Sequence, residues 1–188
     1  STPMFADGHT QDYSEAGLFI FNTLLFLIGG FLVMWMAAGF AMLETGLVRS
    51  KNASTQLLKN VALFSLASIA YFIVGFNLMY PGDGWIINGW MGGFSLTGLE
   101  PAGVGAEGVD LTYASVGSDF FFQLMFCAAT ASIVSGTVAE RVKLWPFLIF
   151  TIVLTGIFYP ISASWQWGGG WLSEAGFSDF AGSTVVHA

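Results

Sequence analysis

Long hydrophobic runs separated by short polar segments dominate this sequence. Four uncharged stretches cover residues 16–43, 60–80, 120–139 and 144–165, and a further apolar run begins near residue 180. A helix of about 20 residues crosses a hydrocarbon core of about 30 Å. The pattern therefore predicts an all-α fold: a polytopic membrane helix bundle with four complete transmembrane helices and the start of a fifth.

The segments between these stretches are expected to be irregular or to cap the helices. Residues 81–119 are rich in Gly and carry Trp, Asp and Glu without clear periodicity, which predicts a long external loop over the helix ends. Alternatively, its acidic residues attract cations to a pore mouth. Ser54 is expected to cap the second helix, with Lys59 within snorkelling reach of the membrane interface. Pro160 is expected to kink the fourth helix.

Composition supports a membrane protein. Of the 188 residues, 55% are hydrophobic and 9% are charged, whereas roughly one quarter of the residues in a soluble domain are charged. The 5 basic residues fall in two short patches, so the sequence offers no basic surface for nucleic acid. The single cysteine, Cys127, lies within an apolar run and provides no disulfide framework.

The basic patches also predict an orientation, because cytoplasmic loops carry an excess of Lys and Arg. Arg49 and Lys51 follow the first stretch, and Arg141 and Lys143 follow the third. Both connections are therefore placed in the cytoplasm, and the N-terminus is placed outside. Tryptophans then gather at the outer interface, as an aromatic belt does: Trp85, Trp90, Trp165, Trp167 and Trp171.

The third stretch carries small residues at helical spacing. Ala128, Ser132 and Gly136 recur every four residues, and a parallel set lies beside them at Ala131, Ser135 and Ala139. This spacing predicts a face for close helix packing. At the end of the same stretch, Glu140 and Arg141 are interpreted either as ordering the loop or as part of a partner surface.

Three aromatic residues near the expected outer ends form a candidate binding site. Phe122 and Phe126 are four residues apart and share one helix face, and Trp167 ends the fourth stretch. Burial or interfacial anchoring explains each of them singly. Together they predict an external site for a small cation, because a desolvated cation–π contact contributes about 2 kcal/mol or more.

His187 and Asp179 lie at the start of the last apolar run. His187 follows two valines and is predicted to lie within the membrane, where ionisable groups are functional candidates. It is interpreted either as a core histidine bonded to a neighbouring helix or as a proton relay near physiological pH. Asp179 is expected to cap the fifth helix, with an indirect electrostatic effect on the aromatic site.

Enzymatic chemistry finds no support in the sequence. There is no cluster of metal ligands, no paired nucleophile and base, and no phosphate-binding loop. The protein is therefore predicted not to be an enzyme and to need no metal or cofactor.

Three motifs resemble those of Amt ammonium transporters. Residues 39–52, GFAMLETGLVRSKN, are similar to the end of the first helix and the first cytoplasmic loop of that family. Residues 135–141, SGTVAER, resemble the end of the third helix. Residues 167–170, WGGG, followed by DFAGSTVVH at 179–187, resemble the most diagnostic stretch.

The resemblance implies a role for each candidate residue. Phe122 and Phe126 correspond to the outer aromatic pair, with Phe126 also part of the pore gate, and Trp167 corresponds to the tryptophan of the external ammonium site. Further roles are implied for three others. Tyr159 corresponds to a tyrosine near the pathway, Asp179 to the aspartate that supports the site, and His187 to the first of twin histidines that line the pore.

The resemblance also implies the nature of the whole protein. Residues 1–188 correspond to the amino-terminal part of one transporter domain with eleven helices in two inverted halves. The implied substrates are ammonium or ammonia, with methylammonium as an analogue. A homotrimer in the lipid bilayer of the cell membrane and a cytoplasmic PII-type regulator are implied as well. Two alternatives remain open: an ammonium sensor with a signalling domain, and an Rh-like gas channel.

Overall fold

A computed structural model describes residues 8–96 and 111–187 of the chain. Its residues divide into two compact units. The first unit comprises Ser1–Leu32 and Gly98–Gln123, and the second comprises Val33–Thr97 and Leu124–Ala188. Two long helices contribute to both units: α1, Gly8–Leu47, and α4, Val116–Thr137.

Four helical segments in the described part of the chain are long and apolar enough to cross a membrane. They confirm the four predicted spans, although each differs in its ends. The segments are Glu15–Leu47, Ser50–Met79, Val116–Thr137 and Leu144–Glu174. The second begins ten residues before the predicted start at residue 60, because Gln56 and Lys59 are buried inside the protein and polar residues therefore do not end the helix.

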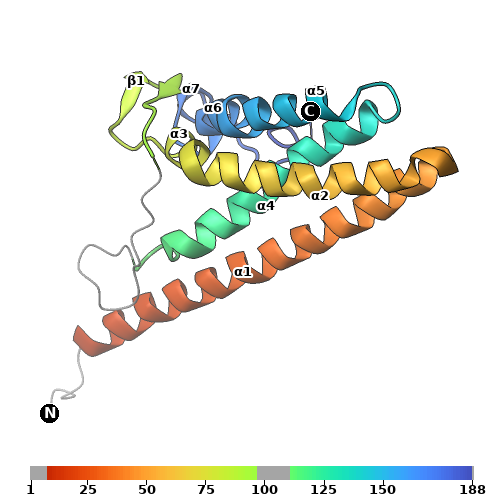
Figure 1. Cartoon of the computed structure of the whole chain (residues 1–188). Helices are drawn as coiled ribbons and strands as arrows, with labels where there is room; N and C mark the ends of the chain where they lie inside the picture. Colours follow the sequence, from red (N-terminus) through yellow and green to blue (C-terminus); the bar gives the residue numbers. More distant parts are fainter. Residues whose placement is uncertain (1–7, 97–110, 188) are drawn as a thin grey trace, which may run out of the picture. The chain divides into compact units, whose positions relative to one another are not determined.

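The second and fourth segments pack side by side in the second unit (Figure 1). The second consists of α2, Ala53–Ala70, then η2, Tyr71–Gly75, and α3, Phe76–Met79. The fourth consists of α5, Leu144–Val153, then η3, Leu154–Phe158, and α6, Tyr159–Gln166, followed by the short α7, Trp171–Glu174. Leu63, Phe147 and Leu148 of these two segments form one buried cluster with Ala131 of α4.

Both segments contain one turn of π-helix, and these two turns pack against each other. In η3 the cause lies in the sequence, because Pro160 has no N–H to donate to the carbonyl of Gly156 four residues earlier. The wider turn thus stands where the kink at Pro160 was predicted. Gly75 lies at the contact, where an added Cβ would come within 3.2 Å of the Thr155 carbonyl oxygen.

The loop after the second segment is more regular than predicted. It contains a small antiparallel hairpin, β1, Trp85–Ile87, and β2, Met91–Gly92. Because α4 begins at Val116, residues 116–119 belong to a helix and not to the predicted loop 81–119. Residues 97–110 of this loop lie outside the described residues.

Three of the five predicted belt tryptophans form one cluster. The Trp90 and Trp171 rings are stacked with centroids 4.6 Å apart, and Trp165 meets each of them at 5.9 Å. The indole Nε1 of Trp165 donates to the Trp90 carbonyl oxygen over 2.8 Å. The cluster ties the hairpin to the end of the fourth segment.

The small-residue face of α4 packs closely, as predicted. Ala128, Ala131, Ser132 and Ser135 are buried. An added Cβ on Gly136 would come within 2.8 Å of the Phe40 ring of α1. The absence of larger side chains therefore permits the close approach of these helices.

The predicted cap of the second helix was wrong. A short 3₁₀ turn, η1, Ser50–Asn52, precedes α2, which begins at Ala53 with Asn52 in the N-cap position. Ser54 is thus already inside the helix. The 3₁₀ turn satisfies the helix end differently, because the Asn52 amide donates to the Arg49 carbonyl oxygen over 2.7 Å.

The expected fifth helix is not formed in the described residues near position 180. Residues 183–187 form turns, with the Val186 amide donating to the Gly182 carbonyl oxygen over 2.9 Å. A helix needs successive bonds of this kind before it becomes stable. The fifth helix therefore stays a prediction for the sequence around and beyond this turn.

In the first unit, polar contacts join α1 to the segment before α4. The Asn22 side chain donates to the Tyr113 carbonyl oxygen over 2.8 Å, and Thr23 accepts from the Ser115 amide over 3.0 Å. Burial, together with the nearby Asp119 carboxylate, raises the pKa of the Tyr113 hydroxyl to about 12. Tyr113 is therefore a neutral hydrogen-bond donor at physiological pH.

Candidate functional site

Trp167 ends α6 as its C-cap residue and is half-buried. Its indole Nε1 donates a hydrogen bond of 2.8 Å to the backbone oxygen of Asp179. Gly182 lies against the indole rim, since an added Cβ there would come within 3.1 Å of the ring, and its φ is +77°. A glycine is required at this position, and the indole is held at a fixed place on the 179–187 segment.

The Asp179 carboxylate organises the segment that leads to His187. Its Oδ1 accepts from the amides of Gly182 and Ser183, and its Oδ2 from those of Thr184 and Val185, over 2.8–3.0 Å. Desolvation by burial opposes ionisation, but these four bonds outweigh it and lower the pKa of Asp179. Asp179 therefore caps this segment as an anion. A cap was predicted at this position, but for an α-helix, whereas the capped segment is a turn.

His187 lies at the end of this turn and is exposed among the described residues. The preceding Val186 is buried, with its methyl group against Gly182. The chain thus links Trp167, Asp179 and His187 through one hydrogen-bonded segment. The position of His187 inside a pore stays a prediction.

The other predicted site residues lie on two helices. Phe122 belongs to the first unit, where its ring stacks on Phe26 with centroids 5.1 Å apart. Phe126 belongs to the second unit and is half-buried on α4. Tyr159 is buried at the start of α6, and its hydroxyl has no hydrogen-bond partner among the described residues.

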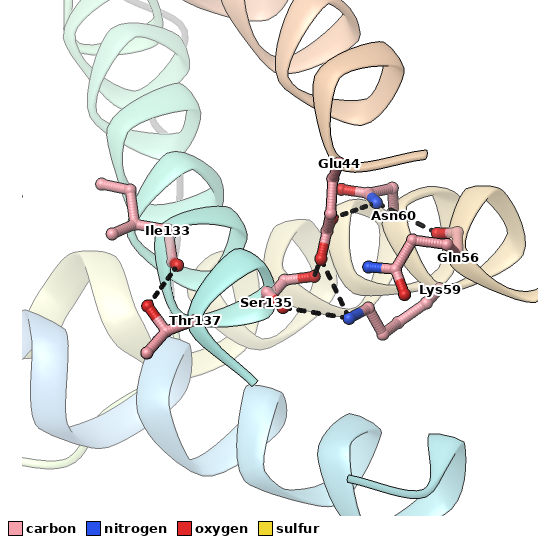
Figure 2. Close-up of polar contacts among 7 residues, drawn as sticks. All are labelled: Glu44, Gln56, Lys59, Asn60, Ile133, Ser135 and Thr137. Carbon is pink, nitrogen blue, oxygen red and sulfur yellow. Dashed lines mark hydrogen bonds and ion pairs between the residues drawn. The ribbon is translucent and has the colours of Figure 1, made fainter. Parts of the chain in front are cut away.

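A buried polar cluster, which the sequence analysis did not identify, joins three helices of the second unit (Figure 2). Glu44 of α1 is 3% exposed, and its carboxylate accepts from Lys59 and Asn60 of α2 and from the Ser135 hydroxyl of α4. The Lys59 Nζ lies 3.1 Å from Glu44 Oε1. The hydrogen bonds from Lys59, Asn60 and Ser135 replace those that water would make to the Glu44 carboxylate.

The prediction that Lys59 snorkels to the interface was wrong. Lys59 is 6% exposed, and its ammonium group also donates to the Ser135 carbonyl oxygen over 3.1 Å. The Phe147 ring covers it at 4.9 Å from Nζ to the ring centroid. The Glu44 carboxylate offsets the cost of burying this ammonium group. The sequence did not reveal this partner, because Glu44 and Lys59 lie on separate helices.

Glu140 orders the loop between α4 and α5. This is one of the two interpretations that the sequence left open for this residue. Its Oε1 accepts from the Arg49 amide, the Arg49 Nε and the Asn52 Nδ2, over 3.0, 3.2 and 2.5 Å. These bonds lower the pKa of the Glu140 carboxyl, and the bond from the Asn52 side chain has the largest effect. They also hold Glu140 at a φ of 61°, a left-handed conformation that is unfavourable for this residue.

Comparison with known proteins agrees with the sequence motifs. A sequence profile described as Ammonium Transporter Family matches residues 24–188. The chain belongs to the ammonium transporter family.

Members of this family from distant organisms cover most of the chain. The ammonium transporter Amt2 of Archaeoglobus fulgidus is 44% identical over 172 residues, which cover 86% of this chain and 34% of that protein. Amt2 of Haloferax mediterranei is 38% identical over 88% of this chain and 35% of that protein. The crystal structure of Candida albicans Mep2 aligns with a TM-score of 0.71 and 28% identity, over 88% of this chain and 35% of that one.

The chain therefore spans about a third of the length of these relatives. Membership of the ammonium transporter family, together with the four membrane-length helices, makes it a multi-pass membrane protein of a transporter family and not of an enzyme family. The relatives support the amino-terminal placement expected from the motifs.

Proposed function

We propose that the protein containing this chain transports ammonium, by recruiting it at an external aromatic site and conducting ammonia with a proton relay through a histidine-lined pore. The observation that carries the proposal is the hydrogen-bonded segment from Trp167 to His187. It connects an aromatic ring face, which binds cations, to an imidazole, which exchanges protons. Family membership supports ammonium as the substrate.

The two parts of the segment solve different energetic problems. A cation–π contact stabilises a desolvated cation by about 2 kcal/mol. Moving a bare ion from water into hydrocarbon costs on the order of tens of kcal/mol according to the Born estimate. An aromatic site can therefore recruit ammonium but cannot carry the ion across. Loss of a proton before the narrow pore removes most of this cost, because neutral ammonia then crosses. The histidine relay carries the proton across as well, so that net transport moves one positive charge.

Asp179 supports this site by position and not by facing the cation. Its carboxylate is occupied by four backbone amides, and its backbone oxygen holds the Trp167 indole. The charge still favours a cation nearby, because the amides leave it ionised. The resemblance to Amt transporters assigns Phe122 and Phe126 to the proposed aromatic entrance and Tyr159 to the neighbourhood of the pathway. It also assigns the second pore histidine to the other half of the transporter.

The same proposal includes the setting of the protein. The N-terminus faces the outside of the cell membrane, because both basic connections are then cytoplasmic. The resemblance to Amt transporters supports a homotrimer, a cytoplasmic PII-type regulator, and an eleven-helix transporter with two inverted halves.

Replacement of Trp167 tests the recruitment step in the full-length protein. Trp167→Leu should raise the ammonium concentration for half-maximal uptake at least about tenfold, because the ring face is lost. Trp145→Leu is the matched control, since Trp145 is 74% exposed at the opposite end of the fourth segment. Unchanged half-saturation in Trp167→Leu, or an equal change in Trp145→Leu, would contradict the proposed site.

A further inference from the structure

The β1–β2 hairpin and the residues directly after it carry an apolar surface that lies outside all four membrane segments. Large side chains that are 49–76% exposed make up this apolar hairpin surface: Ile86, Ile87, Trp90, Phe94 and Leu96. Residues 84–96 contain no charged side chain. Exposed apolar side chains that gather outside a membrane span mark a surface that an apolar partner covers.

Leu96 is held close to the level at which the second membrane segment ends. The Asn77 side chain donates to the Leu96 carbonyl oxygen over 2.9 Å and to the Ser95 hydroxyl over 2.8 Å. Asn77 belongs to α3 and lies two residues before the end of the segment at Met79, and each helical residue rises about 1.5 Å. The backbone at Leu96 therefore lies beside the last turn of the span and not in the water beyond it.

Two further hydrogen bonds hold the tip of the hairpin against the end of the fourth segment. The Trp165 indole donates to the Trp90 carbonyl oxygen, and the Trp171 amide donates to the Gly89 carbonyl oxygen over 3.0 Å. β2 packs against both α3 and α6 (Figure 1). An added Cβ on Gly92 of β2 would come within 3.0 Å of an α3 carbonyl oxygen. The hairpin is therefore fixed at the ends of two membrane segments.

The depth of the apolar hairpin surface decides which partner covers it. Membrane segments end at the headgroup region of a bilayer, where tryptophans also gather. A surface beside those ends faces the boundary between headgroups and acyl chains. Deeper insertion is excluded, because the edges of a two-stranded hairpin carry N–H and C=O groups that hydrocarbon does not satisfy. The side chains can reach the acyl chains while the backbone stays among the headgroups.

We propose that the apolar hairpin surface inserts into the interface of the lipid bilayer and anchors this end of the bundle at a fixed depth. The attraction comes from the apolar area that leaves water. Because residues 84–96 carry no charge, it does not require anionic headgroups. The contact is separate from ammonium transport and does not depend on recruitment of a cation at Trp167.

Site-directed spin labelling of the full-length protein in proteoliposomes tests this contact, on a background without other reactive cysteines. A nitroxide is attached at Ile87→Cys. Its collisions with oxygen, which dissolves in lipid, are compared with its collisions with a nickel chelate, which stays in water. The label should be accessible to oxygen, protected from nickel, and about 5–10 Å below the headgroup level. Asp83→Cys is the matched control, because Asp83 is an exposed charged residue just before the hairpin, and its label should collide with nickel.

Leu96→Cys provides a second reading, on the part of the surface that Asn77 holds. Its label should give the same pattern, so disturbance of the hairpin by one label does not decide the outcome. A label at either position that collides with nickel as often as the Asp83 label faces water and would overturn the proposal. A label shielded from both reagents is covered by protein, from another part of the transporter or from a second copy, and would overturn it equally.

Discussion

Glu44 and Lys59 show how a charged pair is retained inside a membrane bundle. Each group is more than nine-tenths buried, and together they bind Asn60 and Ser135, so that α1, α2 and α4 meet at one point. The pair is costly to desolvate and contributes little net stability by itself. Its effect is to fix which residues of the three helices face one another, because any other register would leave a buried charge without a partner.

Removal of one partner should therefore be more harmful than removal of both. Lys59→Met leaves Glu44 buried and unpaired, which should lower the free energy of unfolding by about 3–5 kcal/mol. The double variant Glu44→Gln with Lys59→Met should recover most of this loss. Thermal unfolding in detergent measures both, with Lys51→Met as the exposed control. A single variant as stable as the wild type would show that the pair does not lock the helices.

Asp179 should act through its charge on the 182–185 amides. Asp179→Asn loses one acceptor oxygen and the charge, so hydrogen exchange at these amides should become about tenfold faster, the factor for about 1.4 kcal/mol. Glu174→Gln, an exposed carboxylate nearby, should leave them unchanged. Exchange rates in the Asp179 variant equal to those of the wild type would show that the carboxylate does not hold the turn.

The pH dependence of this cap follows from the sign of the pKa shift. The folded-state pKa of Asp179 is lowered, so its stabilisation is fully present above the ordinary value for aspartate, about 3.9, and is lost as pH falls through the lower folded value. Protection of the 182–185 amides, corrected for intrinsic exchange, should therefore be constant between about pH 5 and pH 8. A decrease across that range would contradict the ionised cap.

The hydrophobic pattern predicted the burial of a residue correctly where spacing along a helix decides it. It failed where burial depends on one specific partner residue. The small residues of α4 were correctly assigned to a packing face, because their spacing alone determines that contact. Lys59 was misplaced because its burial depends on Glu44, fifteen residues earlier on another helix. The available signal was an acidic residue directly after the uncharged stretch 16–43, still inside the helix α1.

At the scale of elements, the paired π-turns η2 and η3 determine how the second and fourth segments approach each other. Pro160 could be read from the sequence, and with it some irregularity in the fourth segment. The π-turn at residues 71–75 could not, because no proline marks it and it forms where Gly75 meets η3. The hairpin at Trp85–Ile87 was equally hidden, since strands of two or three residues carry no detectable alternation.

Two glycines at this crossing form a matched test. An added Cβ on Gly75 would lie 2.6 Å from the Tyr71 ring, 3.1 Å from Pro160 and 3.2 Å from the Thr155 carbonyl oxygen. On Gly156 it would meet Ala70 Cβ at an ordinary 3.5 Å. Gly75→Ala should therefore lower stability by about 1–3 kcal/mol through overpacking. Gly156→Ala should be nearly neutral, and equal melting temperatures for the two variants would contradict the close crossing.

At the scale of the whole molecule, the chain carries the recruiting half of the proposed pathway. It covers about a third of the length of its relatives. In the proposed transporter with two inverted halves, the pore needs both halves. The four spans and the family were predictable from the sequence, because hydropathy and three motifs determine them. The surroundings of His187 were not predictable in the same way. His187 is exposed at the end of the turn, and the described residues do not show what its side chain contacts in the whole protein.

The central claim is that a proton leaves ammonium and travels past His187 while ammonia crosses the membrane. Ammonium-driven currents, measured on the full-length protein in proteoliposomes, test it most directly. His187→Ala should abolish the current, whereas His9→Ala, at the other histidine of the chain, should leave it intact. A His187→Ala protein that reconstitutes normally and gives an undiminished current would contradict the proton relay.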